Sequence, residues 1–195
     1  MKNIRTIALA AALACAAAGA NAASFACIAG STSDCSEAES TLSWAWNGLD
    51  FTITNATGAL GYVSEVYFDL SAGMAASFLS GTGTVAFYAG ANPGSLPGGN
   101  TVGFVSDTSF DSDVRGQPVY GIDAGESATF RILGASADSF GADATAGVHV
   151  RSLVDSSASL VTTVTTPVPE PSTYGLLLAG LGVVGFVSRR RTKQA

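Results

Sequence analysis

The chain has 195 residues, 47% of them hydrophobic, and a formal net charge of −6. The acidity is concentrated in residues 23–166, where 14 acidic residues accompany three arginines and no lysine, a formal charge of −11. A surface of this sign repels nucleic acid and anionic lipid, so we expect no nucleic-acid partner. We predict that the acidity serves solubility outside the cell, and attraction of divalent cations is the alternative.

The N-terminus has the pattern of a secretory signal peptide. Lys2 and Arg5 precede an alanine-rich apolar stretch, and Ala20 and Ala22 are the small residues that signal peptidase requires before its cleavage point. We therefore predict that residues 1–22 are a signal peptide and that the chain is exported through the Sec machinery. Cleavage by signal peptidase would leave Ala23 as the mature N-terminus.

The chain has three cysteines, and Cys15 falls inside the predicted signal peptide. Acylation of Cys15 as a lipoprotein site is an alternative, although the aliphatic residue of a lipobox, Leu13, stands one place too late. Cys27 and Cys35 reach an oxidising compartment, where a disulfide is the default. Two cysteines without a nearby histidine do not form a zinc site. We predict a Cys27–Cys35 disulfide that staples an otherwise loose N-terminal segment, worth about 2.5 kcal/mol in the chain-entropy model.

Apolar and polar residues alternate through most of the chain after residue 40, which is typical of half-buried β-strands. The residues expected to face the core are Leu42, Trp44, Trp46, Leu49, Phe51, Ile53, Val66, Phe68, Leu70, Val85, Phe87, Ala128, Phe130, Ile132, Val148 and Val150. Segments rich in glycine, serine and proline separate these strands. We predict one all-β domain over residues 23–166, an antiparallel, jelly-roll-like β-sandwich, with a short helical turn within residues 134–145.

The sequence shows no catalytic constellation. Nucleophilic catalysis needs a base beside the nucleophile, and His149 is the only histidine. It alternates with Val148 and Val150, and no G-x-S-x-G elbow precedes it. We predict a solvent-facing histidine and a protein that is not an enzyme. A secreted hydrolase would require an exposed pocket that unites His149 with a serine and a carboxylate.

Three aspartates lie close together in the sequence. Asp107, Asp111 and Asp113 could present carboxylate oxygens to calcium. The segment lacks the later glutamate and the fixed glycine of an EF-hand loop, and loop aspartates commonly cap turns through their own backbone. We therefore expect no cofactor, with calcium at these three residues as the alternative.

Three further features each have two interpretations. Trp44 and Trp46 could stack against sugar rings, but their alternation with Leu42 favours burial in the core. Asn55 begins the glycosylation sequon Asn-Ala-Thr, which we interpret as a turn. The threonine-rich residues 162–166 are either a modification site or a last strand that runs into a linker.

The C-terminal tail combines three signals. Val168, Pro169, Glu170 and Pro171 form a short acidic motif that the two prolines keep extended. Residues 172–188 carry no charge and would extend about 25 Å as a helix, enough for a thin hydrocarbon core. Arg189, Arg190 and Arg191 follow, and cationic flanks stay on the cytoplasmic side. We predict a transmembrane helix at 172–188, a basic tail at 189–195, and translocation of the residues before the motif.

Residues 180–185, Gly-Leu-Gly-Val-Val-Gly, also satisfy the pattern G-x-G-x-x-G. A dinucleotide-binding fingerprint needs a preceding strand and an acidic residue about 20 positions further on, and the sequence has no acidic residue after Glu170. We interpret these glycines as a packing surface of the predicted membrane helix.

Taken together, residues 167–195 resemble the PEP-CTERM sorting signal of Gram-negative bacteria. The Pro-Glu-Pro motif, the glycine-rich apolar stretch and the basic end match that family in order and spacing. The resemblance implies that an exosortase, a membrane-embedded cysteine transpeptidase, processes the chain at or near the motif. It also implies transient anchoring in the inner membrane and a final place at the outer surface or in the extracellular matrix.

The tail and the missing catalytic constellation lead to one main hypothesis. We predict a non-enzymatic surface or extracellular-matrix protein that is structural or adhesive in the polysaccharide layer or biofilm. The alternative is a carbohydrate- or calcium-binding module on the cell surface, based on the tryptophan pair and the aspartates.

Overall fold

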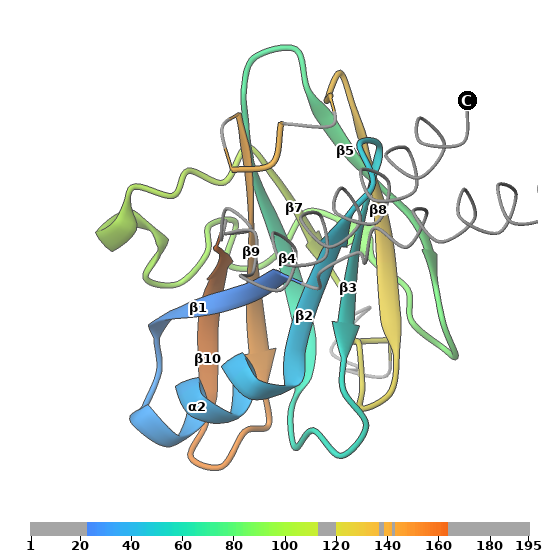
Figure 1. Cartoon of the computed structure of the whole chain (residues 1–195). Helices are drawn as coiled ribbons and strands as arrows, with labels where there is room; N and C mark the ends of the chain where they lie inside the picture. Colours follow the sequence, from blue (N-terminus) through green and yellow to red (C-terminus); the bar gives the residue numbers. More distant parts are fainter. Residues whose placement is uncertain (1–22, 113–119, 137–138, 142, 164–195) are drawn as a thin grey trace, which may run out of the picture. The chain divides into compact units, whose positions relative to one another are not determined.

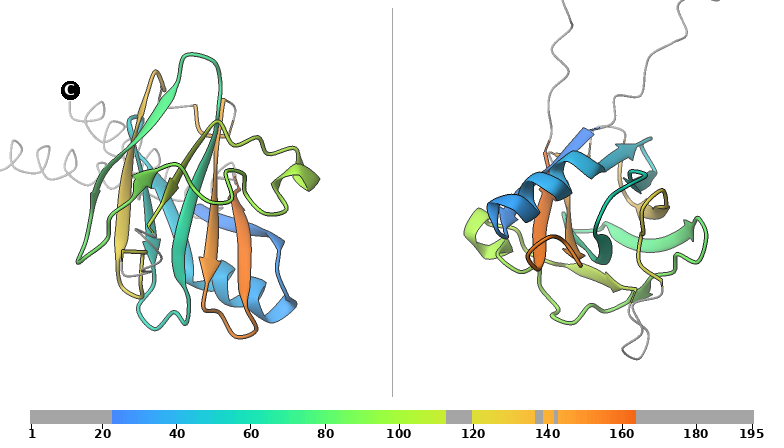
Figure 2. Two further views of the ribbon diagram at one scale, coloured as in Figure 1. Left: turned by 180° about the vertical axis from the view of Figure 1, so that it is seen from behind. Right: turned by 90° about the horizontal axis from the view of Figure 1, so that it is seen from below.

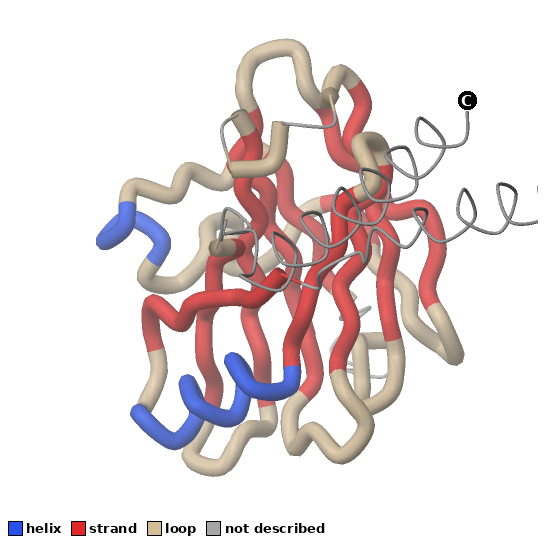
Figure 3. The backbone as a smooth tube through the Cα atoms, viewed as in Figure 1, coloured by secondary structure: helices blue, strands red, loops and turns tan. Residues whose placement is uncertain are grey.

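The computed structural model describes residues 23–112, 120–136, 139–141 and 143–163. Strands are the main secondary structure of this part of the chain, with one α-helix and one 3₁₀ helix, η1 (Figure 3). In chain order the elements are β1 (Ala23–Ala29), α2 (Thr32–Thr41), β2 (Leu42–Trp46), β3 (Asp50–Asn55), β4 (Tyr62–Leu70), β5 (Ala75–Gly81), β6 (Tyr88–Ala89), η1 (Gly99–Val102), β7 (Thr108–Asp111), β8 (Ser127–Leu133), β9 (Ala144–Arg151) and β10 (Ser157–Thr162).

The strands form one antiparallel sheet with the order β5-β8-β3-β2-β1-β10-β9-β4-β7-β6. β1 changes partner along its length, because Ala23 and Ser24 pair with β2, whereas Phe25 to Ala29 pair with β10. We call β5, β8, β3 and β2 the first half-sheet, and β10, β9, β4, β7 and β6 the second half-sheet. The sheet bends at β1, so the two half-sheets face each other and nearly close around the core (Figures 1 and 2).

The predicted antiparallel all-β domain is confirmed. The expected jelly-roll-like sandwich of two separate sheets differs from the structure, because β1 hydrogen-bonds to both half-sheets and makes them one sheet. No helix in the described part of the chain is long and apolar enough to cross a membrane. The predicted membrane span, residues 172–188, lies outside that part.

Aromatic rings fill the space between the half-sheets. Phe51 and Phe130 of the first half-sheet contact Phe68 of the second, with ring centroids 5.7 and 5.4 Å apart. Phe110 of β7 lies 5.1 Å from Phe130. All four rings are buried, and burial of one such side chain contributes roughly 1.5–3 kcal/mol. The core therefore holds the two half-sheets together where no hydrogen bonds join them.

Most residues expected to face inward are buried. They are Leu42, Trp44, Phe51, Ile53, Val66, Phe68, Val85, Phe87, Ala128, Phe130, Ile132, Val148 and Val150, with Trp46 and Leu70 partly buried. Leu49 is the exception and is 42% exposed. The Asn47 side-chain oxygen accepts hydrogen bonds from the amides of Leu49 (3.0 Å) and Asp50 (2.7 Å), so a turn occupies this position and β3 begins only at Asp50.

Helix α2 is not among the predicted elements. Residues 134–145, where a short helical turn was expected, contain no helix among the residues described, and β9 begins at Ala144. The sequence of α2 is polar on every side, so it lacks the apolar stripe by which an amphipathic helix is detected. Ser31 caps the helix, and its hydroxyl accepts a hydrogen bond from the Asp34 amide at 3.2 Å. The N-terminal segment is thus a strand and a helix instead of the loose segment expected.

The outer faces of the two half-sheets differ. On the first, Thr52 and Thr129 share a hydrogen bond (3.1 Å) and remain partly accessible. On the second, residues 90–107, which include η1, form a covering segment. Leu96 and Phe104 of this segment pack on Tyr67, whose hydroxyl donates to the Pro93 carbonyl oxygen at 2.9 Å. Tyr67, Leu96 and Phe104 therefore form a second, smaller apolar cluster on the outer face of β4.

A glycine makes this packing possible. Gly147 lies opposite Tyr67 in the sheet, and a Cβ atom on it would lie 2.5 Å from Leu96 Cδ2 and 3.2 Å from Phe104 Cζ. Any larger residue would push the covering segment away from β9. The sequence places this glycine between alternating apolar residues, where it is easily taken for a weak point of the strand.

Candidate functional site

Most of the predicted sorting and cleavage residues, and one calcium candidate, lie outside the described part of the chain. The sorting and cleavage residues are Ala20, Ala22, Val168, Pro169, Glu170, Pro171, Arg189, Arg190 and Arg191, and the calcium candidate is Asp113. Ala23, the predicted mature N-terminus, is the first described residue and begins β1. The signal peptide, its cleavage point and the membrane span therefore stay predictions from the sequence.

The two ends of the folded domain lie side by side. The Ser24 carbonyl oxygen accepts hydrogen bonds from the Thr163 amide (3.1 Å), the Thr163 hydroxyl (2.8 Å) and the Trp44 indole N–H (2.8 Å). The hydroxyls of Ser24 and Thr163 are 3.2 Å apart. Thr163 is the last residue described before the sorting motif, so the end of the folded domain lies beside Ser24, next to the predicted mature N-terminus. Thr162 is the last residue of β10 and Thr163 follows it, which agrees with the interpretation of a last strand for these two residues, whereas residues 164–166 lie outside the described part of the chain.

The predicted disulfide is confirmed. Cys27 of β1 and Cys35 of α2 are bonded, with their Cα atoms 5.4 Å apart. Around this bond, the Cys27 amide donates to a Glu39 carboxylate oxygen at 2.7 Å. The disulfide therefore joins two elements that side-chain hydrogen bonds also hold together.

The acidic side chains of α2 act as acceptors for backbone amides. Asp34, 1% exposed, accepts from the amides of Asp155 (2.9 Å) and Ser156 (3.1 Å) in the β9–β10 turn. Glu37 accepts from the Leu60 amide at 3.2 Å. These carboxylates satisfy loop N–H groups that lack partners in the sheet. Some acidic side chains of the domain thus stabilise its loops, in addition to the role in solubility that we predict for its negative charge.

Of the three aspartates proposed for calcium, the structure describes two, Asp107 just before β7 and Asp111 at its end. The Asp107 carboxylate accepts a hydrogen bond from the Leu70 amide at 2.8 Å, whereas Asp111 lies in β7 opposite Glu65. Among the residues that the structure describes, no three histidine, cysteine, aspartate or glutamate side chains are arranged to hold a metal ion. Asp107 therefore fits the alternative interpretation of a loop aspartate that caps backbone groups.

Three adjacent strands of the second half-sheet carry a polar row on their outer face. Glu65 of β4 lies opposite His149 of β9, which lies opposite Ser159 of β10. His149 Nδ1 and Ser159 Oγ are 3.0 Å apart. The Glu65 carboxylate accepts hydrogen bonds from the Arg151 guanidinium and from the Ser64 hydroxyl. The sheet register thus assembles a histidine, a serine and a carboxylate that are far apart in the sequence.

Burial determines the protonation of this row. Desolvation raises the pKa of the Glu65 carboxyl, while the Ser64 hydrogen bond and the Arg151 charge act in the opposite direction. Desolvation, with the positive charge of Arg151, lowers the pKa of His149 to about 4. Burial also raises the pKa of Tyr67, and the charges of Glu65 and Asp111 add to that shift. His149 is consequently neutral at pH 7, and its side chain is half-buried on the outer face of the sheet instead of fully facing solvent as predicted.

The polar row does not meet the requirement set above for a hydrolase. Ser159 is 1% exposed and Glu65 is 0% exposed, so a substrate cannot reach either group. The Glu65 carboxylate is engaged by Arg151 instead of orienting His149. We interpret the row as a structural polar network beneath the surface of the second half-sheet.

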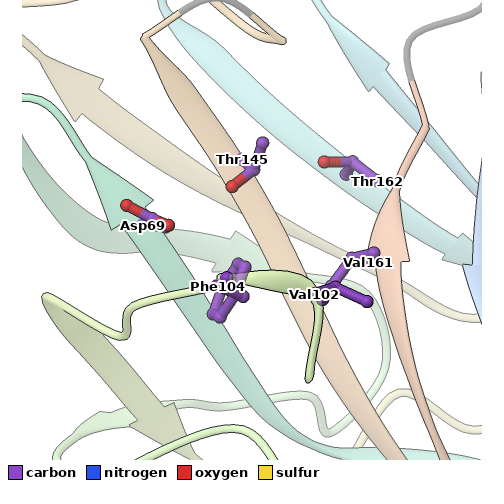
Figure 4. Close-up of a pocket in the computed structure, with 7 residues that line it drawn as sticks. Asp69, Val102, Phe104, Thr145, Val161 and Thr162 are labelled. Carbon is purple, nitrogen blue, oxygen red and sulfur yellow. The ribbon is translucent and has the colours of Figure 1, made fainter. Parts of the chain in front are cut away.

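Two adjoining shallow hollows lie at the end of β4, β9 and β10. The first has a volume of about 260 Å³, and the second, of about 210 Å³, shares Asp69 and Thr145 with it. The Asp69 carboxylate accepts a hydrogen bond from the Val105 amide at 2.9 Å, which fixes it at the rim. The first hollow is lined by Asp69, Val102, Gly103, Phe104, Thr145, Val161 and Thr162 (Figure 4). A carboxylate, two hydroxyls and an aromatic ring together offer polar and apolar contacts to a small hydroxylated ligand.

The tryptophan pair and the glycosylation sequon, the two other candidates from the sequence, are both packed within the folded domain. Trp44 is buried and Trp46 packs on Phe140 with ring centroids 4.8 Å apart, so this pair is no open platform for sugar rings. The buried Asn55 amide donates to the carbonyl oxygens of Gly61 (2.9 Å) and Ile122 (3.1 Å). The sequon is therefore part of a turn, and its asparagine is closed to glycosylation.

The hollow and the polar row were not found from the sequence. The hollow depends on the covering segment, whose Leu96 and Phe104 stand among glycines and prolines without any period. The polar row depends on strand register across β4, β9 and β10. The one available signal was the run of polar residues Glu65, Tyr67 and Asp69 on β4, which alternation alone assigns to solvent.

A family model of the PEP-CTERM protein-sorting motif matches residues 167–191 of the chain. No curated protein and no solved structure matches the chain. The chain is therefore a PEP-CTERM domain-containing protein, as the resemblance in its tail indicated. The motif makes it an exported protein that is sorted at the membrane and targeted to exosortase processing.

Proposed function

We propose that the exported domain is a non-enzymatic surface or extracellular-matrix protein with a structural or adhesive role in the polysaccharide or biofilm layer. The observation that carries this proposal is the sorting motif at residues 167–191, which begins directly after the folded domain. In this proposal an exosortase is the processing partner, and the outer surface or matrix is the final location.

The architecture of the domain supports a passive role. The disulfide between β1 and α2, the clamp between Ser24 and Thr163, and the carboxylates that accept loop amides all favour durability outside the cell. The buried state of His149 and Ser159 supports the absence of enzyme activity. Durability and a sorting signal together are what a matrix component needs.

The intact mass of the protein from native envelope and medium tests the sorting step. We expect a species that starts at Ala23 and ends near residues 169–171, with any added mass reporting a glycan or lipid. Glu170→Gln should block or slow this processing because it removes the acidic group of the motif. Asp143→Asn, the same change at an exposed residue of the folded domain, should be processed normally.

Cells that lack the exosortase provide the decisive comparison. Full-length protein should then accumulate in the inner membrane, and normal maturation in those cells would refute the proposed processing. To test the matrix role, the processed protein is followed through extraction of the polysaccharide layer. A structural role would be refuted if the processed protein is recovered only in the free medium and the polysaccharide layer of cells without this protein is unchanged.

A second candidate function rests on the hollow beside Asp69. A carbohydrate-binding module would use the Asp69 carboxylate and the Thr145 hydroxyl to bind sugar hydroxyl groups, with Phe104 supplying apolar contact. Calcium at Asp107, Asp111 and Asp113 belongs to the same alternative. A glycan array without signal, together with a melting temperature unmoved by calcium, would remove it. Loss of glycan binding in Asp69→Asn, but not in Asp123→Asn at an exposed residue outside both hollows, would support it.

A further inference from the structure

The two edges of the ten-stranded sheet are protected to different degrees. Strand β6, at one edge, has only two residues, and the covering segment with Pro93 follows it. Strand β5, at the other edge, has seven residues, Ala75–Gly81, with neither a charge nor a proline. Natural sheets block edge pairing with short strands, charged residues, proline and bulges. β5 has one of these devices, a bulge at Leu79, and Ala75 to Phe78 pair regularly with β8.

The side chains of β5 suit close approach by another strand. Phe78 faces the core, with its ring centroid 5.8 Å from Phe87 and 5.6 Å from Phe130. It is only partly buried, and no strand among the described residues continues the sheet beyond β5. Ala75 and Ser77 are small and exposed, and Leu79 is 46% exposed. Figure 2 shows β5 as the outermost strand of the first half-sheet. An added strand would therefore complete the cover of Phe78.

The charge of the domain decides which partner fits this edge. Residues 23–166 carry a formal charge of −11, so two copies repel each other wherever their carboxylates meet. β5 is uncharged, and the nearest charges across β8 are those of Arg131, which is paired with Asp50 at 2.8 Å. A basic partner would instead be drawn to the acidic surface elsewhere. The β5 edge is thus a place where a second acidic domain meets no like charge.

We propose that β5 pairs with β5 of a second copy of this chain, antiparallel about a two-fold axis, to form one continuous sheet across two domains. A two-fold arrangement lets the same strand serve both copies. If the axis passes near Phe78, Ser77 lies opposite Leu79 and Ala76 lies opposite Ser80, so every opposed pair is uncharged. This inference goes beyond the sorting and matrix role proposed above and does not depend on it.

Analytical ultracentrifugation of the processed protein, purified from its native envelope, tests the proposal over a range of protein and salt concentrations. We expect a concentration-dependent dimer that strengthens as salt rises, because salt screens the repulsion between the two acidic domains. Association through the acidic surface with a contaminating cation or basic partner would weaken with salt. A monomer at every concentration and salt would overturn the proposal.

A matched pair of variants locates the interface. Leu79→Glu should raise the dimer dissociation constant about tenfold, because the two introduced carboxylates become diagonal neighbours about 7–8 Å apart across the paired strands. Leu60→Glu adds the same charge at an exposed leucine in the β3–β4 loop and should leave the constant close to that of the unmodified protein. Equal effects of the two variants would overturn the proposal. Ser77→Glu, at the exposed residue that faces Leu79 in this register, repeats the test should Leu79→Glu melt at a lower temperature, and the intact mass shows independently whether sorting is unaffected.

Discussion

The outer face of the first half-sheet is accessible to solvent, whereas the covering segment shields much of the corresponding face of the second. Thr52 of β3 and Tyr67 of β4 both alternate with buried core residues, yet Thr52 is partly accessible and Tyr67 is 0% exposed. The two ion pairs differ in the same way, since Glu65 is fully buried while Asp50 is partly exposed. The comparison shows that an alternating strand identifies its inner face, and that the environment of its outer face depends on segments without periodicity.

The largest expected effect comes from removing the aromatic residue of the covered face. Tyr67→Ala should lower the free energy of unfolding by about 3–5 kcal/mol, as for an aromatic residue in a central core, because Leu96 and Phe104 lose their support. Thr52→Ala, at the equivalent position of the accessible face, should cost about 1 kcal/mol or less. Urea unfolding measures both, and equal losses would contradict the distinction between the two faces.

A smaller effect is expected from the two ion pairs. Arg151→Ala leaves the buried Glu65 carboxylate without its partner and should cost about 3 kcal/mol. This value is at the lower end for buried pairs, because Glu65 can take up a proton. Arg131→Ala, the matched change on the accessible face, removes a solvent-screened pair and should leave the unfolding midpoint almost unchanged. Equal destabilisation by Arg131→Ala and Arg151→Ala would show that burial of the carboxylate does not determine the contribution of these ion pairs.

The smallest effect is a dependence on pH. The pKa of His149 is about 4 in the folded domain and 6.5 as its ordinary value, so the unfolded chain binds the proton first as pH falls. Between pH 7 and pH 5 this linkage should remove about 2 kcal/mol of stability. Glu65 has the opposite sign, because its raised pKa favours the folded state as pH falls. Arg151 and Asp111 are the other charged groups near the row.

The variant His149→Gln isolates the contribution of the histidine. The difference in unfolding free energy between this variant and the unmodified protein should change with pH between 7 and 5, while the Glu65 contribution largely cancels. A constant difference over this range would contradict a neutral, half-buried His149. Thermal unfolding at a series of pH values is sufficient for the measurement.

The strands and much of the core could be predicted from the sequence. Period-two alternation located β2, β3, β4, β8 and β9, and their inward residues Trp44, Phe51, Phe68 and Phe130 are buried. The cysteine pair was predictable because an exported domain with two cysteines has one possible pairing. The sorting motif was predictable because its chemistry is local and needs no fold.

The remaining features depend on contacts between distant segments. Helix α2 is stabilised by Ser31, by its disulfide and by the β9–β10 turn, none of which produces a periodic pattern. The continuity of the two half-sheets depends on β1 exchanging partners midway. The burial of Glu65 and His149 depends on strand register across β4, β9 and β10, which a single strand does not reveal.

The pairing of β1 with β10 has a consequence for the order of events during biogenesis. Phe25, near the start of the mature chain, lies opposite Thr162, at the end of the last strand. Contacts between such distant residues form late and slowly, because a long loop must close first. During secretion the first strand emerges long before its partner, and the sheet cannot be completed until nearly the whole domain has crossed the membrane. For a chain exported from its N-terminus, as we predict here, the native fold is completed only after β10, which ends shortly before the sorting motif, has emerged.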